Sequence, residues 1–192
     1  RYARIPLKTV EGFGRERGTV ELRLETRDLE LRAAHTARAG ALLDYYQRNR
    51  AFLAPWEPRR EEAFYTLAAQ YEQLEQEMRQ AETGTAFRFY LTRREEPEQI
   101  IGGIGLSSIV RGCFQSCFLG YKLDGGFTGR GYMTQAVQAV TDFGFGELGL
   151  HRIEGNVMPR NRASLRVLEK CGFQKEGISP RYLKINGVWE DH

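Results

Sequence analysis

The stretch from Leu123 to Val140, LDGGFTGRGYMTQAVQAV, contains residues that could bind an anion. Gly129 and Gly131 directly precede a helical pattern of apolar residues, and the first N–H groups of a helix have no partner inside it. Glycine also lets the backbone curl and approach a ligand without interference from a Cβ atom. Arg130 adds a mobile positive charge. The stretch therefore predicts an anion site at the N-terminus of a helix.

Two well-known phosphate-binding loops are excluded for this stretch. A P-loop requires a Gly-Lys pair, and the sequence contains none. The dinucleotide-binding fingerprint requires a third glycine where Thr134 stands. Taken alone, the motif is equally compatible with a plain glycine-rich turn between a strand and a helix.

A second polar motif follows in the stretch NVMPRNRASLRVLEKCGF, residues 156–173. Pro159 ends a strand, Asn161 can cap the helix that follows, and Ser164 lies one turn into that helix. We expect both polar groups near the mouth between two neighbouring strands. The alternative for this motif alone is an ordinary helix cap followed by a surface serine.

Composition restricts the kind of partner. The net charge of +3 is too weak to indicate a nucleic-acid partner but suits a small anionic ligand. No run of 18 apolar residues and no signal-peptide core are present, so we expect a cytoplasmic protein without a membrane role. The three cysteines, Cys113, Cys117 and Cys171, form neither a disulfide framework nor a metal motif, and we expect buried thiols and no metal.

Alternating and helical patterns predict an α/β (α+β) fold in one domain, residues 20–192, after an irregular arm at 1–19. The order β-β-α-α-β-β-β-α-β-α-β-β indicates a mixed, mostly antiparallel sheet flanked by helices. We expect Thr36 to cap a helix that ends near Asn49, and a non-helical loop from Phe52 to Pro58. The expected apolar stripe of the next helix is Phe64, Leu67, Ala68, Tyr71, Leu74 and Met78. The remaining expected elements are a hairpin of 86–92 with 100–110 around the turn REEPEQ, a strand at 117–123, a helix from near Gly131, a strand at 152–157 and a last hairpin around INGVW.

Taken together, these motifs resemble the GNAT acetyltransferases, and most of all the RimJ-type branch that acetylates the N-termini of ribosomal proteins. The resemblance rests on FLAPWEPRR, IVRGCFQSCFLGY, GFTGRGYM, HRIEGNVMPRNRAS, CGFQKEG and YLKINGVWEDH, and it covers almost the whole chain. It implies the GNAT fold, with two central strands, near Phe118–Leu123 and Arg152–Val157, that splay apart to form the acetyl-CoA cleft. The expected acetyl-CoA-binding residues are Tyr121, Leu123, Thr128, Gly129, Arg130, Gly131, Tyr132, Met133 and Asn161.

The resemblance is incomplete at several positions. The turn of the family begins with Gln or Arg and ends with a small residue, where this chain has Thr128 and Met133. Many members carry a tyrosine four residues after the position of Ser164, where this chain has Leu168. The resemblance implies that Ser164, with Asn161 beside it, protonates the leaving thiolate. The glutamate base proposed for the ribosomal branch corresponds to Leu183, so the base does not carry over.

The missing base favours an acceptor that ionises easily. An α-amino group has a pKa of about 7.7–8.0, so roughly 10–20% is neutral near pH 7, against under about 0.1% of lysine. We therefore expect the acceptor to be a protein N-terminal amine, and the resemblance implies the N-terminal alanine of a small-subunit ribosomal protein. Glu57 is the candidate end of a water relay that takes the proton, and Trp56 and Tyr182 are candidate acceptor contacts.

Two other functions stay open at this stage. The first keeps the fold but acetylates a small amine, such as an antibiotic or a polyamine. The second is an acyl-CoA-binding regulator without catalysis, which loss of the Asn161 and Ser164 pair would favour. We expect a monomer or a homodimer.

Overall fold

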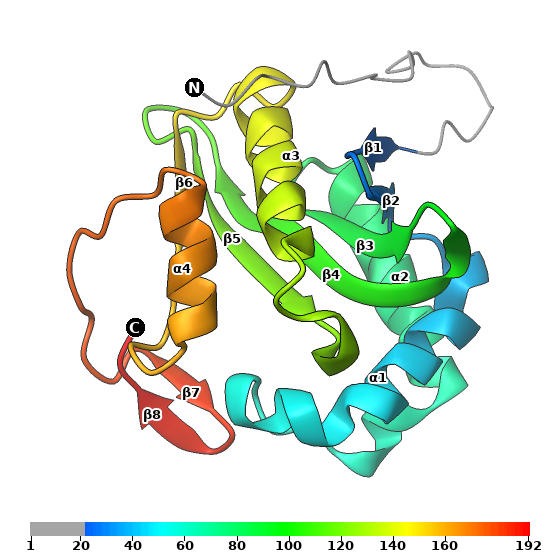
Figure 1. Ribbon diagram of the computed structural model, residues 1–192. Helices are drawn as coiled ribbons and strands as arrows, with labels where there is room; N and C mark the ends of the chain where they lie inside the picture. Colours follow the sequence, from blue (N-terminus) through cyan, green and yellow to red (C-terminus); the bar gives the residue numbers. More distant parts are fainter. Residues whose placement is uncertain (1–21) are drawn as a thin grey trace.

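A six-stranded sheet forms the centre of the computed structural model, which describes residues 22–192 (Figure 1). The expected N-terminal arm lies outside the described residues. The strands are neighbours in space in the order in which they occur in the chain. They are β1 (Arg23–Glu25), β2 (Leu29–Ala33), β3 (Phe87–Arg93), β4 (Glu96–Val110), β5 (Ser116–Leu123) and β6 (Arg152–Gly155).

The helices and a separate hairpin complete the described part of the chain. The α-helices are α1 (Ala39–Leu53), α2 (Leu67–Glu82), α3 (Tyr132–Gly146) and α4 (Arg162–Lys170). Short 3₁₀ turns are η1 (Thr36–Arg38), η2 (Ala54–Trp56), η3 (Glu62–Tyr65) and η4 (Gly125–Phe127). The two-stranded hairpin consists of β7 (Leu183–Ile185) and β8 (Val188–Glu190). The element order and the mixed sheet confirm the fold class predicted from the sequence.

The direction of the strands changes at one place in the sheet. Strands β1 to β5 pair antiparallel with their neighbours, whereas β6 pairs parallel to β5. Parallel neighbours need a crossover connection, because a tight turn cannot bring the chain back to the same end. Helix α3 provides that connection and packs across one face of the sheet (Figure 1).

Side chains that alternate along the strands bury two apolar clusters on opposite faces of the sheet. On β3, Phe89 and Leu91 belong to the cluster under α3, whereas Tyr90 belongs to the cluster under α1 and α2. On β4, Ile101 and Ile104 face α3, and Ile100 faces α1. The molecule is therefore a helix–sheet–helix sandwich with two separately filled cores.

Helix α3 buries the face that its sequence predicts. Met133, Ala136, Val137 and Val140 are all buried in the cluster under α3. One turn further on, the ring of Phe143 lies edge-on to Phe87 and Phe89, at centroid distances of 5.4 and 5.5 Å. These aromatic contacts hold α3 over β3.

The first helix differs from its prediction at both ends. The capping acceptor is His35, whose Nδ1 accepts the N–H of Ala37 at 3.1 Å, and Thr36 begins the 3₁₀ turn η1. The helix continues past Asn49 to Leu53, and η2 follows it. Part of the segment predicted as a loop is therefore helical, because Pro55 stands in the first turn of η2, where no N–H donor is needed.

The predicted apolar stripe of the second helix is wrong in half of its members. Leu67 and Tyr71 are exposed by 56% and 50%, whereas Leu74 and the polar Gln70 are fully buried. The Gln70 side-chain amide donates to the carbonyl oxygen of Phe64, which holds the polar side chain inside. Phe64 itself lies in η3 before the helix, and Thr66 caps α2 by accepting the N–H of Ala69.

The predicted hairpins are present, with one tighter turn than expected. Strand β4 begins at Glu96, so the turn after Arg93 consists of two residues of the predicted REEPEQ. The last hairpin turns at Asn186 and Gly187, which both have positive φ angles of 45° and 86°. Asn-Gly is the favoured pair for this turn, because both residues tolerate the left-handed region. Within residues 22–192, no helix is long and apolar enough to span a membrane.

Candidate functional site

A slot opens between β5 and β6 where their pairing ends. The paired residues run from Ser116 with Arg152 to Leu119 with Gly155, and β5 then continues alone to Leu123. Because the two strands are parallel, α3 and α4 both begin at this same end of the sheet (Figure 1). Ligands of parallel sheets bind outside the carboxyl ends of the strands, so this slot is the expected ligand site.

The free edge of β5 presents backbone polar groups to the slot. Asp124 donates its N–H to the carbonyl oxygen of Ile101 on β4 at 2.8 Å. Backbone groups of successive residues in a strand turn to alternate sides, so those of Tyr121 and Leu123 face the slot. Both residues were predicted to contact the ligand, and this position suits hydrogen bonds to an extended, amide-containing chain.

The glycine turn places free N–H groups at the end of the slot. Gly129 and Gly131 have φ angles of 76° and 78°, in the left-handed region that other residues avoid. A Cβ atom added at either position would meet no protein atom within 4 Å, so the turn faces open space. Gly131 is also the N-cap of α3. The N–H groups of its first turn therefore face a space that an anion can fill.

The other residues of the turn are held by the turn itself. Thr128 donates its hydroxyl to the carbonyl oxygen of Gly125 at 3.1 Å. Arg130 donates to the carbonyl oxygen of Gly126 at 3.0 Å, and its guanidinium lies 5.3 Å from the Phe127 ring centre. Arg130 is thus anchored, not the mobile charge that the sequence suggested.

Two further predicted ligand residues begin α3. Met133, which stands where the family has a small residue, turns its side chain into the core and is 6% exposed. Its N–H stays in the first turn of the helix, so the larger side chain leaves the slot open. Tyr132 is half-buried, with its ring 6.5 Å from that of Phe127.

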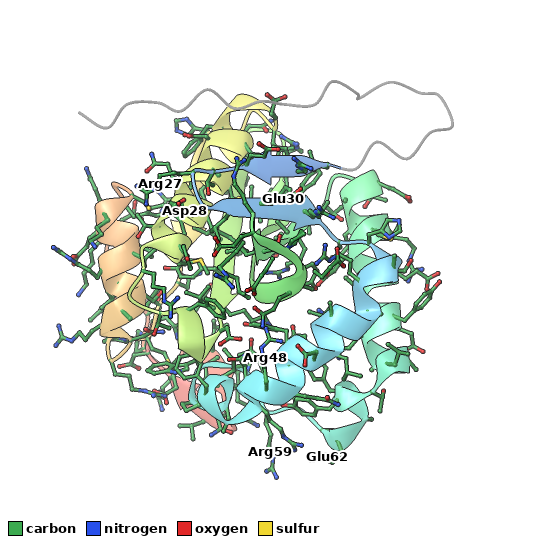
Figure 2. All side chains as sticks on the ribbon, turned by 45° about the vertical axis from the view of Figure 1, so that its right-hand side comes forward. Arg27, Asp28, Glu30, Arg48, Arg59 and Glu62 are labelled. Carbon is green, nitrogen blue, oxygen red and sulfur yellow. The ribbon has the colours of Figure 1, made fainter. Side chains whose placement is uncertain are left out.

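A buried polar network ties α1 to the start of the glycine turn. Asp124 accepts hydrogen bonds from Arg48 at 2.8 Å, from Asn49 at 2.9 Å and from the N–H of Gly126 at 2.8 Å. The Asn49 side chain in turn accepts the N–H of Gly125 at 3.0 Å. Burial raises the pKa of the Asp124 carboxyl, but these donors outweigh it and hold that pKa below its ordinary value. Figure 2 shows Arg48 on α1, the helix that supplies these contacts.

The second motif provides a hydroxyl pair beside the slot. Asn161 caps α4 by accepting the N–H of Ser164 at 3.1 Å, as predicted for this residue. The Ser164 hydroxyl lies 2.8 Å from the phenol oxygen of Tyr121 on β5. Burial raises the pKa of Tyr121 to about 12, although the bond to Ser164 acts in the opposite direction. The phenol is therefore protonated at neutral pH.

Leu168, one turn further along α4, is buried and packs against Gly155 at the end of β6. A Cβ atom on Gly155 would lie 2.8 Å from a Leu168 methyl group. The position that carries a tyrosine in many GNAT acetyltransferases therefore holds a core side chain here.

Glu57 lies on the other face of β5, in an ion pair. Its carboxylate is 2.6 Å from the ammonium group of Lys122, which also donates to the Tyr46 hydroxyl at 2.7 Å. The side chains of Lys122 and Glu57 are only 18% and 16% exposed, so their attraction is screened less than that of a surface pair. The carbonyl oxygen of Glu57 accepts the N–H of Asn186, which joins the last hairpin to this loop.

The two predicted acceptor contacts lie in different surroundings. The Trp56 ring lies 5.1 Å from the guanidinium of Arg160, which also pairs with Glu190 at 2.8 Å. Tyr182 stands at the open end of the last hairpin, where its N–H bonds to the carbonyl oxygen of Glu190. Its ring is exposed, 6.0 Å from that of His192. Tyr182 therefore lies at the opposite end of the hairpin from the turn that contacts Glu57.

Two cavities flank the Glu57–Lys122 pair on this face of the sheet. The larger has a volume of about 460 Å³ and extends from Lys122 along α2. Its polar lining includes Glu72, Gln73, Gln76, Glu77 and Tyr90. The smaller, about 150 Å³, is lined by Glu57 and by Asn186 of the last hairpin. Arg59 lines it and projects outward in Figure 2.

The cysteines take three different positions. Only Cys117 is buried, contrary to the expectation that all three are. Cys171 is half-buried, and Cys113 is exposed because it lies in the turn between β4 and β5. Burial raises the pKa of the Cys117 and Cys171 thiols to about 11. In the described part of the chain, no group of three His, Cys, Asp or Glu side chains could hold a metal ion.

Comparison with known proteins agrees with this geometry. The family model described as "Acetyltransferase (GNAT) domain" matches residues 28–174. The chain belongs to the GNAT acetyltransferase family. The match spans strands β2 to β6, the glycine turn and α4, and thus includes every element that surrounds the slot.

Two relatives extend the similarity over most of the chain. A probable N-acetyltransferase of Bacillus subtilis, YjcK, is 40% identical over 88% of this chain and 93% of its own length. The [ribosomal protein uS5]-alanine N-acetyltransferase of Escherichia coli is 38% identical over 94% of this chain and 92% of its own. RimJ-type enzymes are therefore among the near relatives, as the sequence motifs suggested.

Two solved structures share the fold closely. The ribosomal-protein-S5-alanine acetyltransferase from Vibrio fischeri superposes with a TM-score of 0.85 at 37% identity, over 90% of this chain and 93% of that one. RimJ of Mycobacterium smegmatis, solved with a CoA-disulfide, gives a TM-score of 0.80 at 28% identity, over 85% and 78%. The described fold is thus that of a GNAT acetyltransferase.

The sequence did not indicate the partners of the predicted site residues. Lys122 and Tyr46 surround Glu57, Arg160 stacks on Trp56, and the Tyr121 hydroxyl reaches Ser164. These contacts join residues between 43 and 104 positions apart, so no local pattern marks them. Asp124 is the exception, because an aspartate directly before a Gly-Gly pair is a recognisable turn residue.

Proposed function

We propose that this acetyltransferase transfers the acetyl group of acetyl-CoA to the N-terminal α-amine of a ribosomal protein, alanine being the first residue. Two relatives at 37–38% identity over nine-tenths of the chain carry names that specify this acceptor. The slot between β5 and β6 takes the pantetheine arm, and the turn at 128–133 takes the diphosphate through its N–H groups.

The observation that carries this proposal is the position of the slot between two polar sites. Ser164 and Tyr121 lie on the α4 side of β5, whereas Glu57 and Lys122 lie on the α1 side. A thioester held at the edge of β5 therefore has a hydroxyl donor on one face and the large cavity on the other. The amine reaches the carbonyl carbon from the cavity, and the sulfur leaves toward Ser164.

The acceptor side suits a peptide better than a compact polycation. The larger cavity carries two carboxylates, Glu72 and Glu77, but also the cations Arg60, Arg88 and Lys122. Gln73 and Gln76 add amides that can bond to a peptide backbone. Glu57 pairs with Lys122 and Glu77 with Arg88, so the cavity lacks the excess of negative charge that would favour a polyamine or an aminoglycoside.

The proton balance rests on the acceptor and on Glu57. The α-amine loses one proton to become neutral before attack, and its low pKa makes this step easy near pH 8. In the tetrahedral intermediate the nitrogen loses a second proton, which a water carries toward Glu57, the ion-pair partner of Lys122 in the cavity lining. Glu57 already neutralises Lys122, so it serves as the end of a relay, not as a base in direct contact with the amine.

A thiol-release assay across acceptors tests this function. CoA release is measured with a peptide that begins with Ala, with spermidine and with an aminoglycoside at equal concentration. We expect kcat/KM to be at least about 100-fold higher for the peptide, a difference of about 2.7 kcal/mol in transition-state binding. Faster turnover of either small amine would replace the proposed acceptor class.

A further inference from the structure

The Tyr121 hydroxyl makes two contacts with the same residue of α4. Its oxygen lies 2.8 Å from the Ser164 hydroxyl oxygen and 3.1 Å from the Ser164 carbonyl oxygen. A carbonyl oxygen only accepts, so the phenol is the donor whenever that contact is made. With the hydroxyl of Ser164, either oxygen can donate. A single phenol proton thus chooses between two acceptors on one residue.

The choice decides where the proton of Ser164 points. When Tyr121 donates to the carbonyl oxygen, the Ser164 hydroxyl donates to Tyr121 and its proton is used within the protein. When Tyr121 donates to the Ser164 hydroxyl oxygen, the proton of Ser164 is free to turn toward the slot. Negative charge on a sulfur atom in the slot favours the second arrangement, because charge-assisted hydrogen bonds are the stronger ones.

We propose that Tyr121 is a positioning residue for acetyl transfer, and that its phenol directs the proton of Ser164 at the leaving sulfur. This inference rests on the proposed function, in which the thioester lies at the edge of β5. Tyr121 acts through Ser164 and does not need to contact the substrate with its hydroxyl. Its backbone N–H and C=O groups face the slot independently of the hydroxyl.

The bond changes balance as follows. The C–N bond forms, and the C–S bond breaks with its electron pair on sulfur. Sulfur takes the proton of Ser164, and the Ser164 oxygen takes the phenol proton of Tyr121. The nitrogen gives its proton to the water relay that ends at Glu57, and solvent water returns one proton to Tyr121 after the thiol has formed. The net change is one proton moved from nitrogen to sulfur, with CoA released as the thiol.

The surroundings keep Tyr121 in its donor form. The phenol is partly buried between β5 and α4, and its pKa of about 12 keeps it protonated throughout the pH range of an assay. The cap at Asn161 fixes the backbone of Ser164 by accepting its N–H. The position of the serine is therefore set by α4, and the orientation of its hydroxyl is set by Tyr121.

A double-mutant cycle tests the pairing. Tyr121→Phe keeps the ring and removes the hydroxyl, Ser164→Ala removes its partner, and Tyr71→Phe removes an exposed hydroxyl on α2 as the matched control. We expect Tyr121→Phe to lower kcat about 10-fold with the KM for acetyl-CoA within about twofold. The double variant should be no slower than Ser164→Ala, because residues that act as a unit are not additive. Tyr71→Phe should match the wild type.

Additive losses, or a change confined to the KM for acetyl-CoA and to the melting temperature, would reduce Tyr121 to a structural tether and overturn the inference. The cycle is also measured on the slow hydrolysis of acetyl-CoA without any amine. Coupling that persists in hydrolysis supports the pairing even if the peptide acceptor is wrong. If the wild type acetylates the peptide but the cycle shows no coupling between Tyr121 and Ser164, the pairing is contradicted and the proposed function stands.

Discussion

The Asn49 side chain on α1 accepts the N–H of Gly125 at 3.0 Å and donates to Asp124 at 2.9 Å. Helix α1, on one face of the sheet, thus holds Gly125 at the start of the glycine turn. The same turn ends at Gly131, where α3 begins on the other face. Asn49 is 2% exposed, so water cannot replace these bonds when they are lost.

Replacing Asn49 should therefore affect stability and cofactor binding together. Asn49→Ala leaves a buried carboxylate and an N–H with fewer partners, which costs about 1–3 kcal/mol of the free energy of unfolding. We also expect the KM for acetyl-CoA to rise several-fold, because the turn at 125–131 loses its anchor. Urea denaturation and steady-state kinetics measure the two effects. A variant that is destabilised but keeps its KM would show that the turn holds its shape without α1.

The role of Gly131, at the start of α3, can be tested by comparison with Gly84, which also has a positive φ angle. Gly131→Ala and Gly84→Ala both place a Cβ at a φ near 70–80° in open space, so each should cost roughly 1–2 kcal/mol of stability. Gly84 follows α2, away from the slot, whereas the methyl group at 131 would occupy space that the diphosphate needs. We expect Gly131→Ala alone to raise the KM for acetyl-CoA, by at least about 10-fold. Equal KM values in the two variants would remove this turn from the cofactor site.

The role of Glu57 can be tested by comparison with Glu62, a nearby glutamate that is also ion-paired. Glu57→Gln keeps the size of the side chain but removes the carboxylate charge beside Lys122, and we expect kcat to fall about 10- to 100-fold. Glu62→Gln is the control, because Glu62 is also ion-paired, with Arg50, but is exposed. Steady-state assays with saturating acetyl-CoA give kcat for both variants. A loss below about threefold for Glu57→Gln would leave it as the structural partner of Lys122.

The cysteines should differ sharply toward a thiol reagent. The thiolate is the reactive form, and with pKa values of about 11 only about 0.1% of Cys117 and Cys171 is thiolate at pH 8. We expect one fast thiol, the exposed Cys113, and two slow ones whose rates rise as the pH approaches 11. Chromogenic thiol titration, repeated in denaturant to reveal all three, measures this. Cys113→Ser is the control, and the fast phase should be absent from it. A fast reaction of Cys171 in that variant would contradict the burial of its thiol.

Local signals explain what could be predicted from the sequence. The glycine turn, the cap at Asn161 and the buried face of α3 depend on residues within a few positions of each other, and the structure has them as expected. The second helix shows the limit, since Gln70 is buried and Tyr71 exposed only because a hydrogen bond to Phe64 fixes the rotation of the helix. The Lys122–Glu57 and Tyr121–Ser164 pairs need the complete sheet, so no sequence window contains them.

The acceptor is the central claim, and the location of the transferred acetyl group tests it most directly. Two peptides of the same sequence are compared at pH 7, one with a free N-terminal alanine, the other with a blocked N-terminus and a free lysine, and mass spectrometry locates the acetyl group. We expect acetylation at the α-amine of the first peptide, with a rate that rises with pH and levels off near 8, the pKa of that amine. The blocked peptide should be modified at least about 100-fold more slowly, because so little lysine is neutral. Acetyl groups found chiefly on lysine side chains would contradict the proposed function.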